Sequence, residues 1–379
     1  MSEKKYTIGC VTSSISYYGG WDTLSKGIIN AVAKKHNVIV LTSKSGHNDE
    51  VPYPIYSVLP KKYITYSIWN QLVVFFYCLK YFRSCDAIHT FIEPFTPGAA
   101  LAAKVLRKPL FITIAAAYAI IPKGNKLRQI LKRAMMKFMY NQAVFIATGS
   151  HQNIELIEEV MSLKNKWKFV PFGVDSEKYQ NTKTYAPSPY PFLLTVGAVK
   201  PRKGALFVIR ALGLLKDELP ELRYKIGGTI DEQVPYVQEL RAAVKELGLE
   251  DRVEFLGRIS DEALVELYAT CTAFVLAVQN QKDGGREGFP MVFYEAHSLG
   301  APVISTYGFG SEYVIKNGHN GFIVEQGSVV AVADAIRKIV SNPELRKEMS
   351  VHALEEAHKH PWDEITKHYL QAYEDNIKV

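Results

Sequence analysis

Two acidic residues in the second half of the chain are spaced so that they could hold one ligand. The segment from Arg286 reads Arg-Glu-Gly-Phe-Pro-Met-Val-Phe-Tyr-Glu, and seven residues separate Glu287 from Glu295. Pro290 suits the first position of a helix and Gly300 the residue just past its end. We therefore expect Glu287 in the preceding loop and Glu295 on the second helical turn. Free N–H groups at the helix start would form an anion site between the two acids. A diphosphate between two hydroxyl-rich groups, as in a sugar nucleotide, matches this layout.

Length and composition narrow the class of protein. A chain of 379 residues favours two domains, and 47% hydrophobic and 22% charged residues are ordinary values for a globular protein. Its 4 cysteines are scattered, without a Cys-x-x-Cys pair, which favours reduced thiols, a cytoplasmic protein and no structural metal site. The start of the chain has no secretory signal pattern. The apolar stretch 68–82 is shorter than the roughly 20 residues of a membrane span, so we expect a buried or partly exposed helix.

Positive charge is concentrated in the first half. Residues 1–186 carry 24 Lys and Arg against 11 Asp and Glu, whereas the remainder carries 21 against 27. Within 51–142 the count is 13 basic residues against 2 acidic ones. This asymmetry indicates an anionic partner of the first half, such as a phosphorylated acceptor, a membrane surface or a nucleic acid. A solvated basic face without a specific partner remains the alternative.

Short apolar runs alternate with helical segments through nearly the whole chain. This alternation predicts parallel, doubly wound α/β sheets. Strands are expected at Ile8–Thr12, Val38–Leu41, Ala87–Phe91, Leu110–Ile114, Val144–Ala147, Lys168–Pro171, Phe192–Val196, Arg223–Ile226, Val253–Phe255, Ala273–Val278 and Val303–Ser305. Helices are expected at Thr23–His36, Gly98–Leu106, Lys203–Leu215, Val234–Leu247 and Pro361–Ile377.

A proline-rich stretch separates two such α/β patterns. Pro187, Pro189 and Pro191 interrupt both helix and strand, so the domain boundary is expected between about 172 and 190. We predict a first domain over 1–180, completed by a C-terminal helix at 361–379 that packs back on it. The second domain is predicted over 181–360.

Several motifs in the second half occur in an order typical of one enzyme family. They are Val196-Gly-Ala-Val-Lys-Pro-Arg-Lys-Gly204, Phe255-Leu-Gly-Arg-Ile-Ser260, the pair Glu287 and Glu295, and Asn317-Gly-His-Asn-Gly-Phe-Ile-Val324. Pro171-Phe-Gly-Val-Asp175 resembles the segment that joins the two domains of that family. The chain thus resembles the retaining glycosyltransferases of family 4 over nearly its whole length. The resemblance implies the GT-B fold, with two facing Rossmann-like doubly wound domains, the first binding the acceptor and the second the nucleotide sugar.

The resemblance also implies roles for the two acids. Glu295 would accept hydrogen bonds from the two ribose hydroxyls, as an ionised carboxylate can. Glu287 would bind hydroxyls of the donor sugar and act as a catalytic residue. Backbone N–H groups of Gly288, Phe289 and Met291 would face the sugar or diphosphate, whereas Pro290 has none to offer. The structural alternative is a solvated Glu295 and a Glu287 that only favours a helix N-terminus.

A lysine at a strand-to-helix turn matches the diphosphate side of such a site. Lys203, with Arg202 beside it, would neutralise the leaving diphosphate together with the start of the following helix, so neither a metal nor another cofactor is expected. By resemblance, Gly257, Arg258 and Ile259 would hold the nucleotide base, although Arg258 could equally be an ordinary surface residue.

The first domain has a glycine pair typical of the family, whereas two side chains that the family usually has are missing from the chain. Gly19 and Gly20 resemble the family's glycines near the reacting phosphate and acceptor, with a structural turn as the alternative. The family usually has Arg where this chain has Ala198, and often a His where the chain reads Ala115-Ala116-Ala117-Tyr118. Lys200 or Arg202 could replace the missing cation, and Tyr118 could fill part of the second site.

Residues 123–142 predict a basic amphipathic helix. Such a helix suits an anionic or lipid-linked acceptor and peripheral contact with the inner membrane face, or simply a core helix with solvated charges. No nucleic-acid-binding module is recognisable. We expect a cytoplasmic, retaining, metal-independent glycosyltransferase. The alternatives are a catalytically silent sugar-nucleotide-binding protein and another GT-B enzyme such as a sugar-nucleotide epimerase.

Overall fold

A computed structural model gives the fold of the chain. It describes residues 4–16, 19–61, 66–115, 126–179, 184–280, 288–308 and 310–378. Glu287, Tyr118 and the first three residues of the segment 123–142 lie outside the described residues, so the expectations attached to them stay predictions.

The chain forms two compact units. The first comprises 1–173 and 362–379, and the second comprises 174–361. At the boundary, the N–H of Val174 donates to the carbonyl of His360 at 2.9 Å, which pairs the two ends of the second unit. This division falls earlier in the chain than residue 180, inside the interval expected for the boundary.

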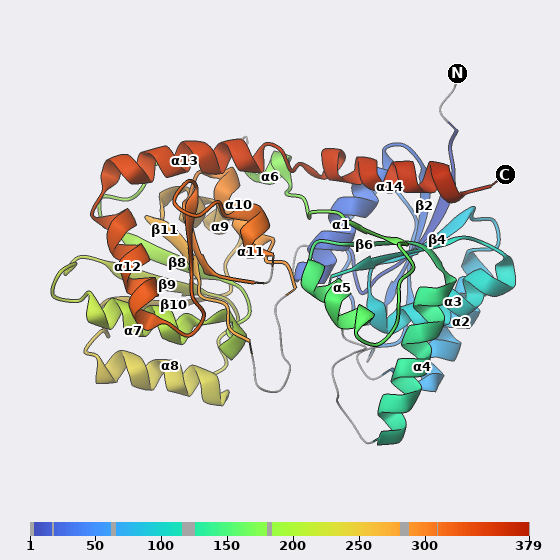
Figure 1. The fold of residues 1–379 in the computed structure, drawn as a ribbon, viewed down its shortest axis with the longest axis horizontal. Helices are drawn as coiled ribbons and strands as arrows, with labels where there is room; N and C mark the ends of the chain where they lie inside the picture. The colour runs from blue at the N-terminus through green and yellow to red at the C-terminus, as the bar shows by residue number, and fades with distance from the viewer. Residues whose placement is uncertain are drawn as a thin grey trace. The chain divides into compact units, whose positions relative to one another are not determined.

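In the described part of the first unit, seven parallel strands lie in the order β3-β2-β1-β4-β5-β6-β7. Helices join them (Figure 1). The strands are β1 Thr7–Val11, β2 Asn37–Ser43, β3 Ile55–Leu59, β4 Ala87–Thr90, β5 Leu110–Ile114, β6 Ala143–Thr148 and β7 Trp167–Phe169. The helices are α1 Gly20–Ala33, α2 Ile68–Tyr81, α3 Thr96–Leu106, α4 Lys126–Gln142, α5 His151–Glu158 and α14 Trp362–Asn376, with the 3-10 turn η1 Glu93–Phe95 after β4.

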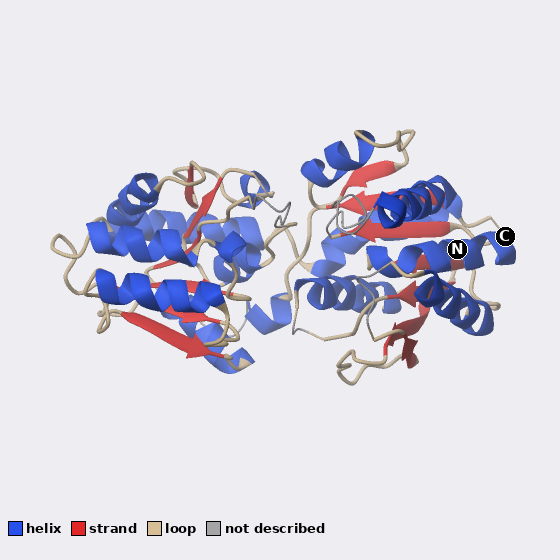
Figure 2. Cartoon of the chain, turned by 90° about the horizontal axis from the view of Figure 1, so that it is seen from below, coloured by secondary structure: helices blue, strands red, loops and turns tan. Residues whose placement is uncertain are grey.

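Helices cover both faces of this sheet (Figure 2). The strand order reverses direction at β1, and right-handed crossovers then put α1 on one face and α2, α3 and α4 on the other. Apolar side chains of β1, β4, β5, α2, α3 and α4 form one core under the second group. The predicted doubly wound architecture is confirmed for this unit.

The C-terminal helix α14 completes the first unit by packing on α1. Gly27 of α1 makes room for this contact, since a Cβ there would lie 2.1 Å from the ring of Trp362. Further along α14, the hydroxyl of Tyr373 is 2.6 Å from His89 Nδ1, while His89 Nε2 is 2.8 Å from Thr113 Oγ1. Burial lowers the pKa of His89 to about 3, so the ring is neutral at pH 7. The predicted packing of the C-terminal helix on the first domain is confirmed.

The described part of the second unit contains six parallel strands in the order β10-β9-β8-β11-β12-β13, with their own apolar core. The strands are β8 Phe192–Val196, β9 Arg223–Gly227, β10 Val253–Gly257, β11 Ala273–Leu276, β12 Val303–Thr306 and β13 Gly321–Val324. The helices are α6 Ser176–Tyr179, α7 Ala205–Leu214, α8 Pro235–Glu246, α9 Asp261–Thr270, α10 Val292–Ser298, α11 Ser311–Val314, α12 Val329–Val340 and α13 Pro343–Ala357, with the turn η2 Pro201–Lys203. This unit is also doubly wound, as predicted.

Candidate functional site

The carboxyl ends of β8, β9, β10 and β11 meet at one edge of the second unit's sheet. The strand order reverses at β8, whose neighbours are β9 on one side and β11 on the other. In doubly wound sheets, such a reversal at the carboxyl edge is where ligands bind, because the loops diverge to opposite faces there. Among the described donor candidates, Arg202, Lys203, Gly257, Arg258 and Ile259 lie in the segments that follow β8 and β10, and Glu295 lies on helix α10 after β11.

The loop from β8 to α7 depends on glycines for its path. Gly204 has a φ of 72°, and a Cβ there would lie 1.7 Å from the carbonyl oxygen of Ala277, so only glycine fits. Gly197 has a φ of 137° and directly follows β8. The backbone N–H of Gln279 donates to the carbonyl of Arg202 at 2.9 Å, which ties the turn η2 to the segment after β11. These contacts hold the loop close against the sheet edge.

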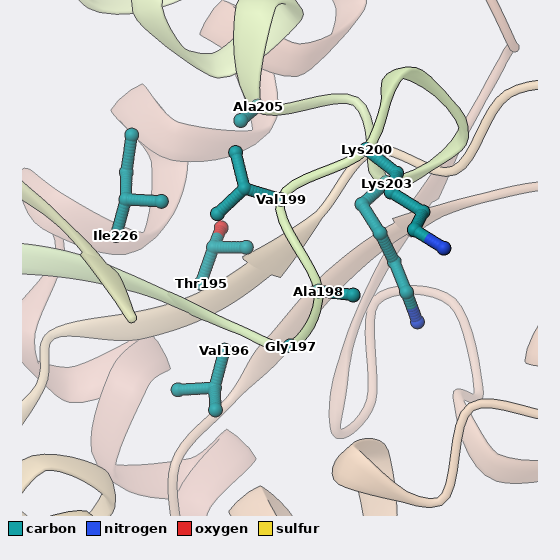
Figure 3. Close-up of a pocket in the computed structure, with 9 residues that line it drawn as sticks. All are labelled: Thr195, Val196, Gly197, Ala198, Val199, Lys200, Lys203, Ala205 and Ile226. Atoms are coloured by element: carbon teal, nitrogen blue, oxygen red, sulfur yellow. The ribbon is translucent and has the colours of Figure 1, made fainter. Parts of the chain in front are cut away.

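Two lysines of this loop extend to the same side (Figure 3). A Cβ built on Gly197 would be 3.9 Å from Lys203 Nζ, so the Lys203 ammonium lies next to the bare backbone of Gly197. The methyl group of Ala198 points toward the side on which Lys200 and Lys203 lie. The loop also encloses a small pocket, whose lining residues are Thr195, Val196, Gly197, Ala198, Val199, Lys200, Lys203, Ala205 and Ile226. The loop between β8 and α7 thus presents two ammonium groups on one side.

The turn after β10 stacks on the turns after β9 and β8. The N–H of Gly228 donates to the carbonyl of Gly257 at 2.8 Å, and Gly257 has a φ of 68°. Ile259 packs on Gly227, since a Cβ at that glycine would meet the Ile259 side chain at 2.1 Å. Arg258, by contrast, is exposed. The backbone of this turn thus lies at the sheet edge, and the contact of Ile259 with Gly227 holds it there.

The helix that carries Glu295 begins later than the sequence predicted. Helix α10 starts at Val292, so Pro290 is not its first residue and Glu295 lies in its first turn instead of its second. The carbonyl of Pro290 accepts from the N–H of Phe293 at 3.1 Å, which makes the entry to the helix a tight turn. Gly300 has the predicted place past the helix end, with a φ of 79°. Phe289, Pro290 and Met291 are buried, and Gly288 is partly exposed.

Glu295 is surrounded by polar groups from two other helices. Its Oε2 accepts from the hydroxyl of Tyr268 in α9 at 3.1 Å, and the side chain of Tyr179 in α6 is a further hydrogen-bond partner. Lys178 is close enough to favour the charged form of Glu295, and its Nζ contacts Asp261 Oδ1 at 2.7 Å. A carboxylate offers about four acceptor positions, so these two tyrosines leave room for a ligand's hydroxyls.

Burial raises the pKa of Glu295 above its ordinary value, against the opposing effects of Lys178 and the two tyrosines. The pKa of Tyr268 is also raised, first by burial and then by the negative charge of Glu295, so its hydroxyl keeps its proton and stays a donor. Such a desolvated acid with a fixed donor is typical of functional sites, although structural networks show it too.

Sequence reasoning did not find Tyr268, Lys178 or Tyr179. They lie on two other helices, α6 and α9, which are distant from Glu295 along the chain, and a single sequence carries no signal for such contacts. The Asn317–Val324 motif, in turn, has a structural role. Asn317 Oδ1 accepts from the N–H of Ile323, and Asn320 bonds to the backbone of Lys316 and Val314. These bonds hold the loop that leads into β13.

The glycine pair of the first unit lies at the start of α1. Gly19 caps the helix with extended backbone, and its Cβ would be 3.1 Å from Asp22 Oδ2. Gly20 is the first helical residue, and a Cβ there would meet no described atom within 4 Å. Ala115 directly follows β5, and its carbonyl is 3.5 Å from Asn153 Nδ2. The described structure therefore does not itself require glycine at position 20.

Two searches of the described residues concern membranes and metals. No helix in these ranges is both long enough and apolar enough to cross a bilayer. No three or more His, Cys, Asp or Glu side chains gather among these residues in a way that could hold a metal ion.

Comparisons with known proteins extend this picture. Residues 177–355 match the family model of glycosyl transferases group 1. This matched segment lies within the second unit, 174–361. The D-inositol 3-phosphate glycosyltransferase of Nocardioides sp. is 28% identical over 192 residues, which are 48% of this chain and 41% of that protein. The GDP-mannose-dependent alpha-(1-6)-phosphatidylinositol monomannoside mannosyltransferase of Mycobacterium tuberculosis is 26% identical over 185 residues, 46% of each protein. The chain thus spans less than half the length of the curated relatives it matches.

Solved structures resemble the chain over nearly its whole length. Anabaena HepE in complex with UDP and glucose has a TM-score of 0.77 at 18% identity, covering 97% of this chain and 99% of that one. Sucrose-phosphate synthase from Thermosynechococcus elongatus has a TM-score of 0.77 at 20% identity, covering 98% and 99%. At such identities the likeness concerns the fold, and it confirms the predicted GT-B class.

Proposed function

We propose that the chain is a retaining glycosyltransferase of family 4 that moves a sugar from a nucleotide donor to an acceptor without a metal ion. The observation that carries the proposal is the sheet edge of the second unit. It combines a glycine-framed lysine loop, the β10 turn and the desolvated carboxylate of Glu295 within the segment that matches glycosyl transferases group 1. The UDP complex of HepE and the GDP-mannose dependence of the mycobacterial relative favour a nucleoside diphosphate sugar as donor.

In this proposal the residues divide between the two ends of the donor. Glu295 accepts from the ribose hydroxyls, and the turn at Gly257, Arg258 and Ile259 holds the base. Lys203 stabilises the diphosphate, with Lys200 as its second cation and Arg202 beside them. Glu287 and the backbone N–H groups of Gly288, Phe289 and Met291 orient the sugar. Binding and charge stabilisation of this kind act before and during departure of the diphosphate.

The transfer step is the same-face attack that the resemblance to family 4 implies. The acceptor hydroxyl oxygen attacks the anomeric carbon from the face that the diphosphate leaves. The bond from that carbon to the phosphate oxygen breaks while the bond to the acceptor oxygen forms, and the acceptor proton passes to the departing phosphate oxygen. Lys203 and Lys200 lower the barrier because negative charge grows on that phosphate.

The acceptor is proposed to bind the first unit. Gly19, Gly20 and Tyr118 are its proposed contacts, and the basic helix within 123–142 favours an anionic or lipid-linked acceptor. The two curated relatives act on inositol 3-phosphate and a phosphatidylinositol mannoside by name, which are acceptors of that kind. Contact of 123–142 with the inner membrane face belongs to the same proposal, as does a cytoplasmic location.

A donor screen followed by product analysis tests the proposal. Thermal shift with UDP-, GDP- and ADP-sugars identifies the donor, because a ligand that binds the native state raises the melting temperature. The preferred donor is then incubated with phosphorylated and lipid-linked acceptors, and the anomeric configuration of the product is read by NMR. An inverted product contradicts retention. Binding without either transfer or hydrolysis identifies the silent alternative, which Ala198 and the run Ala115-Ala116-Ala117 favour. An epimerised nucleotide sugar identifies the epimerase.

Lys200→Ala is expected to lower kcat by roughly 10- to 100-fold, the effect of losing one charge-assisted hydrogen bond of about 1.5 to 3 kcal/mol. The reason is that Lys200 and Lys203 point to the same side of the loop. Adding Ala198→Arg to this variant is expected to restore most of the loss, because that side chain starts on the same side. Steady-state kinetics of both variants check the result, and an unchanged kcat in Lys200→Ala removes Lys200 from the site.

The variant Gly20→Ala tests whether glycine at position 20 is needed for ligand binding or only for the structure of the turn. The methyl group meets no described atom, so the free energy of unfolding should stay the same or rise by up to about 1 kcal/mol. If the acceptor or phosphate approaches this backbone, kcat/KM for the acceptor should fall at least tenfold, since the methyl group fills that approach. Urea unfolding and acceptor kinetics measure the two effects. A variant with normal kinetics would assign Gly20 to the turn alone.

A further inference from the structure

Helix α2 of the first unit has apolar residues on its outer face as well as its inner one. Gln71, Val74 and Cys78 face the core and are buried. On the opposite side, Trp69 is 73% exposed, Phe76 62% and Leu72 38%. Their spacing of three and four residues puts them on one stripe of the helix. A helix that is apolar on both sides normally lies inside a protein, yet no described part of this chain covers this stripe.

The neighbouring helices continue this outer apolar surface. Helix α3 contacts both α2 and α4, and Figure 1 shows the three helices side by side. Leu101 and Val105 of α3 are exposed, and so are Leu127 and Ile130 in the first turns of α4. We call these seven side chains, from Trp69 to Ile130, the apolar helix surface. Exposed apolar side chains gathered on helices that pack together are typical of an interaction site.

The charges around the apolar helix surface have one sign. Exposed basic residues lie on the same helices or just after them, whereas the two acidic residues of 51–142 do not face outward with them. Glu93 is buried and accepts from Tyr66 and Tyr140, and Asp86 accepts from the N–H of Thr7. After Glu50, the next exposed acidic residues along the described chain are those of α5. The exposed basic residues are Lys80, Arg83, Lys104, Arg107, Lys126, Arg128, Arg133 and Lys137.

We infer that the apolar helix surface inserts into the interface of an anionic lipid bilayer. A bilayer interface accepts aliphatic and aromatic side chains to a shallow depth, favours tryptophan, and attracts surrounding Lys and Arg when its headgroups are negative. A protein partner or a second copy of the chain would need acidic groups to match the basic border. The inference deepens the proposed membrane contact of 123–142 by adding apolar side chains of α2 and α3 to it, and the surface would act whether or not the chain transfers sugar.

Flotation of the full-length protein with vesicles tests the inference without any nucleotide sugar. Vesicles of phosphatidylcholine with 30% phosphatidylglycerol, and of phosphatidylcholine alone, are compared in low and high salt. Binding to the anionic vesicles is expected in both salts, because apolar insertion persists when salt screens the charges. Trp69→Ser with Phe76→Ser is expected to weaken partitioning at least tenfold. Leu214→Ser with Val351→Ser is the matched control, since both are exposed apolar residues of the second unit.

Tryptophan fluorescence gives a second readout. Trp69 should shift to shorter wavelength on the anionic vesicles and be quenched by brominated lipids, and Trp69→Phe should lose that signal while still floating. Equal flotation of the Trp69→Ser, Phe76→Ser variant and the control overturns the inference, as does absence of binding. A dimer in light scattering that the same variant dissociates also overturns it, because the surface is then an interface between copies.

Discussion

Lys203→Ala is expected to lower kcat for sugar transfer by roughly 10²- to 10³-fold, the usual effect of removing one donor that stabilises charge in the transition state. The Lys203 ammonium lies beside the bare backbone of Gly197 at the start of α7. The diphosphate gains charge only as it departs, so the loss should appear mainly in kcat and less in KM for the donor.

Single-turnover and steady-state kinetics measure this effect. Lys347→Ala is the matched control, because Lys347 is an exposed lysine of α13 in the same unit. The melting temperature of both variants should stay near that of the parent protein. A Lys203→Ala enzyme with normal kcat would place the diphosphate elsewhere, whereas a change in donor KM alone would reduce Lys203 to a binding residue.

Glu295→Gln is expected to weaken nucleotide binding by roughly 10- to 100-fold while leaving the ligand-free protein at least as stable. The affinity falls because a neutral amide loses the charge that strengthens two hydrogen bonds from the ribose, about 1.5 to 3 kcal/mol in all. The stability does not fall because burial of the ionised carboxylate already opposes folding, as its raised pKa records. Tyr268 can still donate to the amide oxygen.

The pH dependence of this pair of effects has a definite sign. The folded protein holds the Glu295 proton more tightly than the unfolded chain does, because burial raises the pKa of Glu295 above its ordinary value of 4.5. The stabilisation that comes from this tighter proton binding is therefore complete below pH 4.5 and is lost as pH rises through the raised pKa of Glu295. The gain in melting temperature of Glu295→Gln should thus appear at pH 7 and vanish at pH 4. Nucleotide affinity of the parent protein should weaken as pH falls through the raised pKa.

Calorimetric titration of UDP and GDP, with thermal melts at pH 4 and pH 7, covers both effects. Glu348→Gln, an exposed glutamate of α13, serves as the matched control. Unchanged nucleotide affinity together with a lower melting temperature would make Glu295 a structural partner of Tyr268 and Lys178, with no part in the donor site.

Local patterns predicted the elements well where a strand is buried on both faces. The ranges Leu110–Ile114 and Phe192–Val196 match β5 and β8 residue for residue, because each is a short, mainly apolar run that begins directly after a proline. Strand β3 was missed because it is an edge strand with an exposed middle, between two prolines. The start of α10 was placed too early, because Pro290 suits a tight turn as well as a first helical residue.

The candidate site was predictable to the extent that its residues lie in continuous motifs. Lys203, Gly204 and Gly257 belong to such segments, and their backbone angles agree with glycine at the two latter positions. The surroundings of Glu295 were not predictable, since Tyr268 and Tyr179 reach it only through the packing of α9 and α6 on α10. The exposed stripe of α2 could not be predicted either, although its residues are close together in the sequence. An apolar helix reads the same in sequence whether its outer side is covered or bare.

The position of α14 in the first unit has a consequence for the order in which the chain acquires its structure during synthesis. The second unit is one continuous segment, 174–361, and it can fold once that segment has emerged. The sheet of the first unit is complete by β7, but its helical face at α1 stays open until Trp362 and Tyr373 arrive, some 200 residues later. At a synthesis rate of about 5 to 20 residues per second, α14 is made roughly 10 to 40 s after β7. Until then Trp362 is not available to pack against Gly27. A segment that is translated some 200 residues after β7 is therefore what completes the first unit.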